Sequence, residues 1–225
     1  MSLSAETIRL KVRNKIFIPL TFRSRGKKLR CKSFTIISNN CWAGTVYESY
    51  GLKKQSPTVG MFIMPDDYIK LARNFEHYMK QTPKIIPLEM SKWKSELEHK
   101  DNWGTYPVAR LDDIELHLLH YHDEEMFMEK WKRRVERIDK KRIIFKFNDQ
   151  NGCREKHIKE FMSLPIKNKL CFVSKKELKI SDDVLLIKQP ERYKDGIKAS
   201  REPFGRTKYI DMTSYLNSLE ENTDE

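Results

Sequence analysis

Short runs rich in β-branched and aromatic residues alternate with helix-like segments along most of this 225-residue chain. The strand-like runs lie at residues 33–38, 58–64, 106–111, 114–121, 142–147, 169–174 and 184–187. Apolar residues at helical spacing predict helices at residues 41–50, 65–78, 88–98, 123–138, 155–162 and 211–219. Regular alternation of strand and helix is typical of α/β proteins. The sequence therefore predicts a single α/β domain with a mostly parallel sheet and helices on both faces, as in Rossmann-like folds.

Charge divides the chain into a basic N-terminal segment, residues 1–32, an α/β domain, residues 33–219, and an acidic tail, residues 220–225. The formal net charge is +12, from 44 Lys and Arg against 32 Asp and Glu. Between Thr7 and Tyr47 there are ten basic residues and no acidic one. A block of this kind attracts an anion, such as a phosphorylated substrate, an anionic membrane surface or a nucleic acid.

Within the basic segment, apolar residues recur every four positions, at Ile8, Val12, Ile16 and Leu20. This spacing predicts an amphipathic helix. Such a helix lies on an anionic membrane surface, or it packs on the domain with its basic face in water. Nucleic acid is not an expected partner, because the basic excess is terminal and no helix-turn-helix, zinc finger or RNP-type strand is recognisable.

The remaining composition favours a cytoplasmic protein that the basic helix would hold at the inner face of the cell membrane. No run of 18 apolar residues is present, and the first residues lack the apolar core of a secretory signal. The four cysteines are far apart, which predicts reduced thiols; they are Cys31, Cys41, Cys153 and Cys171.

Five segments occur in the order seen in a known bacterial family. They are Ile36-Ile37-Ser38-Asn39-Asn40-Cys41-Trp42-Ala43-Gly44, Ser56-Pro57-Thr58, Tyr106-Pro107-Val108, His120-Tyr121-His122 and Lys130-Trp131-x-x-Arg134-x-x-Arg137-Ile138. Over residues 34–219 the chain thereby resembles the exopolysaccharide-biosynthesis protein family, domain of unknown function family nineteen-nineteen. Because members commonly belong to capsule and exopolysaccharide gene clusters, the resemblance implies work on a bacterial surface glycan. Ala43 stands where the family commonly has glycine, and the basic N-terminal segment lies outside the family pattern.

A first candidate cluster follows the strand predicted at residues 33–38. Ligands of open α/β sheets bind where strands end and helices begin, and free N–H groups there favour phosphate. Ser38, Asn39 and Asn40 would bind sugar hydroxyls or a diphosphate, and Trp42 would stack on a sugar ring or a base. The alternative is that Asn39 only caps the helix. Cys41 has no base beside it in sequence, so a nucleophilic role is disfavoured.

A second cluster combines histidines with carboxylates. On a strand, His120 and His122 would share a face, and one of them would act as the base that deprotonates an acceptor hydroxyl. Glu124 or Glu125 would orient the imidazole. The alternatives are a metal site on the same residues, or a buried histidine followed by acids that complement a helix dipole.

A third cluster, Trp131, Arg134 and Arg137, occupies successive turns of a predicted helix. Two guanidinium groups one turn apart can bracket a diphosphate, whereas the alternative is a solvated basic face. No cofactor is firmly implied. Mg²⁺ is conceivable at the acidic turns Asp66-Asp67 and 148–152, although ordinary turn chemistry explains both.

These clusters predict one cleft at the carboxyl ends of the sheet, lined by six residues from three segments: Asn39, Asn40, His120, His122, Arg134 and Arg137. With the resemblance, they favour a glycosyltransferase that uses a nucleoside diphosphate-sugar and a lipid-linked or glycan acceptor. The alternatives are an acyl or other decorating transferase of the same pathway and a non-catalytic glycan-binding protein.

Overall fold

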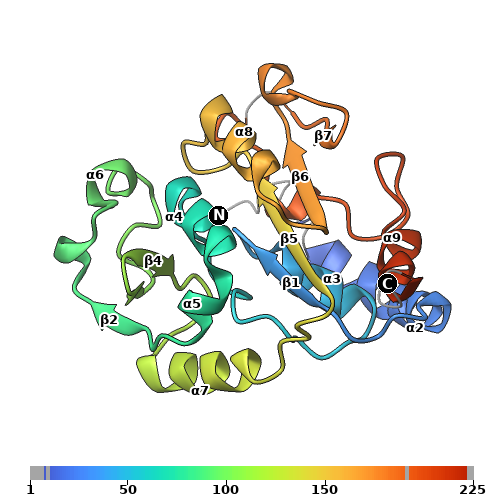
Figure 1. Cartoon of the computed structure of the whole chain (residues 1–225), viewed down its shortest axis with the longest axis horizontal. Helices are drawn as coiled ribbons and strands as arrows, with labels where there is room; N and C mark the ends of the chain where they lie inside the picture. The colour runs from blue at the N-terminus through green and yellow to red at the C-terminus, as the bar shows by residue number, and fades with distance from the viewer. Residues whose placement is uncertain (1–7, 9–10, 191–192, 222–225) are drawn as a thin grey trace.

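The computed structural model describes residue 8 and residues 11–190 and 193–221, and its centre is a four-stranded parallel sheet (Figure 1). The strand order is β1-β5-β6-β7. The strands are β1 (Thr35–Ser38), β5 (Ile143–Asn148), β6 (Lys169–Val173) and β7 (Val184–Leu186). In this register Ile36 pairs with Ile144 and Phe147 with Cys171. The predicted α/β class and the mostly parallel sheet are confirmed.

Helices flank the sheet because its strands are apolar on both sides, as expected for buried parallel strands. Ile36, Ile144 and Phe172 belong to a core shared with α3 and α9, whereas Ile37 and Phe147 belong to a core shared with α4 and α8. The α-helices flanking the sheet or the adjoining chain are α3 (Trp42–Ser49), α4 (Pro65–Arg73), α5 (Phe75–Met79), α6 (Lys94–Leu97), α7 (Glu124–Val135), α8 (Glu155–Ser163) and α9 (Met212–Glu221). The 3₁₀ turns are η2 (Leu88–Met90), η3 (Lys176–Leu178) and η4 (Ala199–Arg201).

A small antiparallel sheet stands beside the main one (Figure 1). It contains β2 (Lys84–Ile86), β3 (Val108–Leu111) and β4 (Ile114–His117). The runs predicted at 106–111 and 114–121 thus form a hairpin, whose turn places Asp112 at φ 57°. The predicted strand 114–121 ends at His117, so His120 and His122 lie in the following loop.

Three other predicted elements differ from the structure. The helix predicted at 65–78 is divided at Asn74 into α4 and α5. Residues 58–64 form no strand, since Gly60 has φ 93°, outside the strand region, and the segment makes one isolated bridge, between Phe62 and His117. The helix predicted at 88–98 is interrupted at Ser91, whose ψ of 128° is extended and whose hydroxyl donates to Glu115 at 2.6 Å.

Within the described part of the basic N-terminal segment, residues 13–28 are helical and pack on the domain. They comprise a π-helix, η1 (Arg13–Phe17), followed by α2 (Ile18–Lys28), which contacts α3. Ile18 is buried, and the ring of Phe22 packs so closely on Gly51 that a β-carbon there would lie 2.7 Å from it. None of the helices in the described part of the chain combines the length and apolarity needed to cross a bilayer.

Candidate functional site

A buried polar network occupies the carboxyl ends of β1 and β5. Lys146, on β5, is fully buried and forms an ion pair with the buried Glu202. The Lys146 ammonium also donates to Asn40 Oδ1 at 3.0 Å, and Asn148 Nδ2 donates to Glu202 Oε1 at 2.7 Å. Burial lowers the pKa of Lys146, and the charge of Glu202 opposes this shift. The network therefore joins the sheet to the C-terminal segment around Glu202.

The predicted substrate-binding residues after β1 belong to this network. Asn40 Nδ2 donates to Gln150 Oε1 at 2.9 Å, and Asn39 Nδ2 donates to Asn148 Oδ1 at 2.7 Å. Ser38 is buried, and its hydroxyl donates to Asn40 Oδ1 at 3.1 Å. These side chains contact one another and line neither of the two pockets described below.

Trp42 is a core residue. Its side chain is fully buried, its ring packs edge-on against Phe172 at 5.4 Å between centroids, and its Nε1 donates to Pro203 O at 2.7 Å. A buried ring has no face left for a sugar or a base, so the predicted stacking role is wrong.

A pocket of about 600 Å³ opens beside this network, between α3, α7, the loop after β4 and the segment 198–200. We call it the cationic pocket, because five basic side chains and one acidic side chain line it: Arg13, Lys54, Lys130, Arg134, Lys198 and Glu48. Glu48 pairs with Lys54 at 2.7 Å. The lining thus carries a net positive charge, which favours an anionic ligand.

Arg134 is the buried cation of this pocket, with 8% of its surface exposed. Its Nη1 donates to Val59 O at 2.9 Å and to the Tyr121 hydroxyl at 2.5 Å. No carboxylate among the described residues pairs with this guanidinium, and its Nη2 and Nε have no protein acceptor there. A buried charge without a counter-ion is costly, and a bound anion would compensate it.

His120 lies on the same pocket wall, with its backbone N–H donating to Gly60 O at 3.0 Å. Partial removal from water lowers its pKa below the usual 6.5, and the nearby charge of Lys54 lowers it further, while Glu48 opposes the shift. The imidazole is therefore mostly neutral at pH 7, which is the form that accepts a proton.

Cys41 also lines the cationic pocket. Burial raises the pKa of its thiol to about 12. A thiol with such a pKa is protonated at neutral pH and is a poor nucleophile. All four cysteines are free, as predicted, and three of them are buried.

Of the six residues predicted to line one cleft, the structure brings His120 and Arg134 together in the cationic pocket. Arg137 is exposed in the turn after α7, which ends at Val135. His122 is exposed in the loop before α7 and does not line the pocket, because β4 ends too early to align it with His120.

Glu124 and Glu125 are exposed in the first turn of α7 and stand outside the pocket. Asp123 caps that helix by accepting from Met126 N at 2.7 Å. The two glutamates thus complement the helix dipole. Trp131, of the third cluster, is buried in the core that contains α4 and α8.

Three of the five motif segments meet at the cationic pocket, although they are distant in sequence, and a fourth, Ser56-Pro57-Thr58, directly precedes two lining residues. The pocket is lined by Cys41 and Gly44, by residues 59–60 directly after Ser56-Pro57-Thr58, by residues 120–121, and by Lys130 and Arg134. No pattern in the sequence pointed to Lys54 and Lys198, since lysines in loops have no periodic spacing. Lys130 stands in a quoted motif and could have been found.

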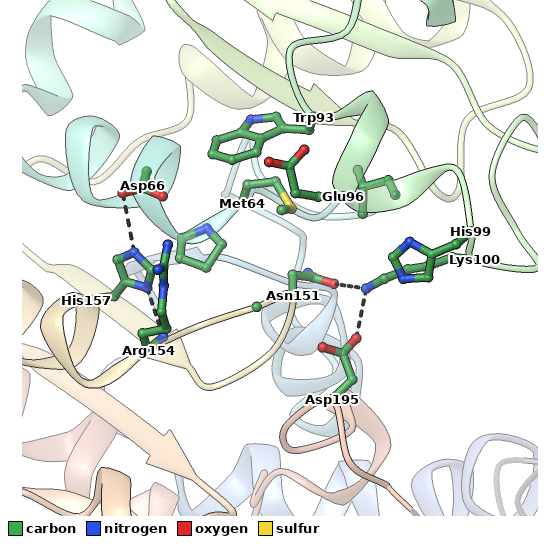
Figure 2. Close-up of a pocket in the computed structure, with 13 residues that line it drawn as sticks. Met64, Asp66, Trp93, Glu96, His99, Lys100, Asn151, Arg154, His157 and Asp195 are labelled. Atoms are coloured by element: carbon green, nitrogen blue, oxygen red, sulfur yellow. Dashed lines mark hydrogen bonds and ion pairs between the residues drawn. The ribbon is translucent and has the colours of Figure 1, made fainter.

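A second, smaller pocket of about 320 Å³ was not predicted (Figure 2). Figure 2 shows Asp66 and His157 at one end and, at the other, Lys100 held between Asn151 and Asp195. The His157 Nε2 lies 3.3 Å from Asp66 Oδ1. Its Nδ1 accepts from Arg154 N at 2.9 Å, which caps α8.

Two stretches of chain, residues 59–66 and 195–200, each contribute to both pockets, but with different residues. Residues 59–60 and 198–200 line the cationic pocket, whereas residues 64–66 and Asp195 line the smaller one. Burial lowers the pKa of His157, and Asp66 opposes this shift. The smaller pocket carries charges of both signs, so it lacks the positive excess of its neighbour.

The acidic turns considered for Mg²⁺ are occupied by protein donors. Asp67 is buried and accepts from Lys92 Nζ, Trp93 Nε1 and Glu115 N. Asp149 accepts from Ser174 N and from Ile197 N, both at 2.7 Å. Across the described ranges, no group of three or more His, Cys, Asp and Glu side chains could hold a metal ion.

Comparison with known proteins places the chain in one family. The sequence pattern of a family described as "Domain of unknown function (DUF1919)" matches residues 12–220. A protein of Haemophilus influenzae, described as an uncharacterized protein, is 31% identical over 163 residues, which cover 72% of this chain and 71% of that protein. Because the match extends over nearly the whole chain, this protein belongs to the DUF1919 family.

Proposed function

We propose that this protein is a glycosyltransferase of bacterial capsule or exopolysaccharide assembly, which binds a nucleoside diphosphate-sugar in the cationic pocket and transfers the sugar to a lipid-linked or glycan acceptor. The observation that carries the proposal is the buried Arg134 guanidinium, which has no carboxylate partner among the described residues and lines a pocket of positive charge. The pathway rests on the family resemblance.

The chemistry suits a diphosphate leaving group. During transfer, the bond from the anomeric carbon to the diphosphate oxygen breaks, and negative charge develops on that oxygen. Arg134 and Lys130 line one wall of the pocket from the same helix, one turn apart. Fixed cations aimed at a developing negative charge stabilise the transition state more than the ground state.

The base in this proposal is His120. Its imidazole takes the proton of the acceptor hydroxyl as the oxygen of that hydroxyl bonds to the anomeric carbon. The lowered pKa of His120 keeps the imidazole able to accept this proton at pH 7. A bound diphosphate would raise the pKa of His120, because the negative charge favours the imidazolium.

Calorimetric titration with uridine diphosphate and with coenzyme A tests the proposal. Lys130→Gln is the informative variant, because Lys130 lines the pocket and its ammonium stacks over the Tyr121 ring at 5.4 Å without a carboxylate partner among the described residues. We expect it to weaken uridine diphosphate about tenfold, the loss of one charge-assisted contact. Lys132→Gln, an exposed lysine of the same helix, is the matched control and should bind as the wild type.

A second measurement follows the His120 imidazole by NMR titration. Uridine diphosphate should raise its pKa in the wild type. A His120→Gln variant should lose transferase turnover by about 10²–10⁴-fold while still binding uridine diphosphate. Binding of coenzyme A in place of uridine diphosphate would instead support the acyl transferase. Equal loss in Lys130→Gln and Lys132→Gln would mean that the cationic pocket is not the site.

A further inference from the structure

The apolar residues that the sequence spaces four apart form one exposed stripe along the N-terminal helix. Ile8, Val12, Ile16 and Leu20 are all exposed, with Leu20 at 75%, and we call them the apolar stripe. Among the described residues, six large apolar side chains are exposed, and only Met90 lies outside this helix. The stripe is therefore a concentrated feature and not part of a generally apolar surface.

The orientation of the stripe is fixed by the opposite side of the same helix. Ile18 is buried and Phe22 packs on Gly51. The C-terminal end of α2 is tied to α9, because Asn217 Nδ2 donates to Lys28 O at 3.1 Å and its Oδ1 accepts from Arg30 N at 2.8 Å. The domain thus holds the helix with its apolar stripe facing outward.

The charges beside the stripe have one sign. The exposed side chains of Lys11, Lys15, Arg23, Lys27 and Lys28 stand on the same helix. No acidic residue occurs between Thr7 and Tyr47 to neutralise them. Two copies of this chain that paired through their stripes would bring these cations together, so a second copy is a poor occupant.

We propose that this helix docks the protein on an anionic phospholipid membrane, with the apolar stripe among the acyl chains and the lysines among the headgroups. None of the helices in the described part of the chain is long and apolar enough to span a bilayer, and an amphipathic helix of this kind is suited to lying in the interface. Anionic headgroups supply the negative charges that balance the lysines and arginines of the helix. The docking does not depend on the proposed transferase activity.

The helix also contributes one lining residue to the cationic pocket. Arg13 lines that pocket, and its Nη1 donates to Ser200 O at 3.1 Å. A helix that lies on the membrane through its stripe therefore holds the pocket close to the headgroup layer. If the pocket binds a diphosphate, this placement gives it access to a lipid-linked substrate.

Co-sedimentation with vesicles tests the docking on the full chain. We expect binding to vesicles of phosphatidylglycerol and phosphatidylcholine, little binding to pure phosphatidylcholine, and weakening in high salt. Leu20→Glu should reduce binding at least about tenfold, because a charge replaces an inserted apolar side chain. Met90→Glu, an exposed apolar residue away from the helix, is the matched control and should bind as the wild type.

The charge contribution is measured with Lys11→Gln/Lys15→Gln, which should bind about 30-fold more weakly than the wild type. The exposed pair Lys132→Gln/Lys140→Gln removes the same charge elsewhere and should have little effect.

Equal binding to neutral and anionic vesicles, or unchanged binding of Leu20→Glu, would overturn the proposal. The proposal would also be overturned if light scattering showed a wild-type dimer that Leu20→Glu dissociates and neither protein bound vesicles. The apolar stripe would then be an interface between two copies of the chain. Titration of uridine diphosphate in solution is independent of this result and keeps the two proposals distinguishable.

Discussion

At the scale of single residues, the buried ion pair of Lys146 and Glu202 joins two parts of the chain that are distant in sequence. Lys146 lies in the run Arg-Ile-Ile-Phe-Lys-Phe. Strand alternation in this run predicts which face of the sheet Lys146 occupies, but it does not predict which residues cover that face. Glu202, the partner of Lys146, is 56 positions away, in a segment without regular structure. Partners of this kind are set by tertiary packing, and Asn39 and Asn40 belong to the same buried network.

His117 shows how burial acts on one residue. It is fully buried, it stacks on Phe62 at 4.4 Å between centroids, and neither ring nitrogen has a hydrogen-bond partner in the described part of the chain. Burial lowers its pKa to about 3, and the charges of Lys100 and Lys92 add to the shift. In the unfolded chain the pKa is about 6.5.

Because the folded-state pKa of His117 lies below the unfolded value, its neutral form stabilises the fold fully above pH 6.5, and this contribution is lost as the pH falls toward 3. Between pH 7 and pH 4 the wild type should lose about 3 kcal/mol of unfolding free energy more than a His117→Phe variant does. Urea unfolding at the two pH values measures the difference. A His122→Phe variant, altered at an exposed histidine, should behave as the wild type. Parallel losses in wild type and His117→Phe would contradict the assignment.

At the scale of elements, local pattern predicted the main sheet well. The strands β1, β5, β6 and β7 each lie within one or two residues of the predicted runs, because buried parallel strands are apolar on both faces. The small antiparallel sheet could not be placed this way. Strand residues do not specify their partner strand, and the hairpin between β3 and β4 depends on a turn at Asp112 in the left-handed region.

The segment after β7 is held on the sheet by a loop clamp in which Asp149 Oδ1 accepts from Ile197 N. Gly196, beside it, has φ 82°, and a β-carbon there would collide with the backbone of Asp149. Gly152 has φ 73° and open space around it. The two glycines share a backbone conformation but differ in what surrounds them.

Gly152→Ala should therefore cost about 1 kcal/mol of unfolding free energy, from the left-handed conformation alone. Gly196→Ala should cost about 1–3 kcal/mol more, because the backbone of Asp149 must move. Denaturant unfolding of both variants measures this difference. Equal losses of unfolding free energy in the two variants would show that the backbone of Asp149 moves without an energetic cost. The loop clamp would then not hold the segment after β7.

At the scale of the whole molecule, the cationic pocket joins parts of the chain that the fold brings together from both ends. Its lining comes from the N-terminal helix, α3, the segment 59–60, the loop before α7, α7 and the segment 198–200. The sequence pattern pointed to His120 and Arg134 but not to the other charged residues of the pocket. The positions of Lys54 and Lys198 depend on loops, whose paths are not encoded in a periodic pattern.

A ligand that binds the cationic pocket should stabilise all of these segments together, since it binds only when they are assembled. At a uridine diphosphate concentration about 100 times its Kd, openings that release the ligand become about 100-fold rarer. Hydrogen exchange followed by mass spectrometry should then show slower exchange in residues 41–48, 120–134 and 198–200. Residues 93–100, which line the smaller pocket, serve as the internal control and should exchange as before. Lys130→Gln should reduce the protection from about 100-fold to about tenfold at equal ligand concentration, whereas Lys132→Gln should keep it in full. Protection confined to residues 93–100 and 151–157 would instead show that the diphosphate binds in the smaller pocket. Arg134 would then have no role in binding it.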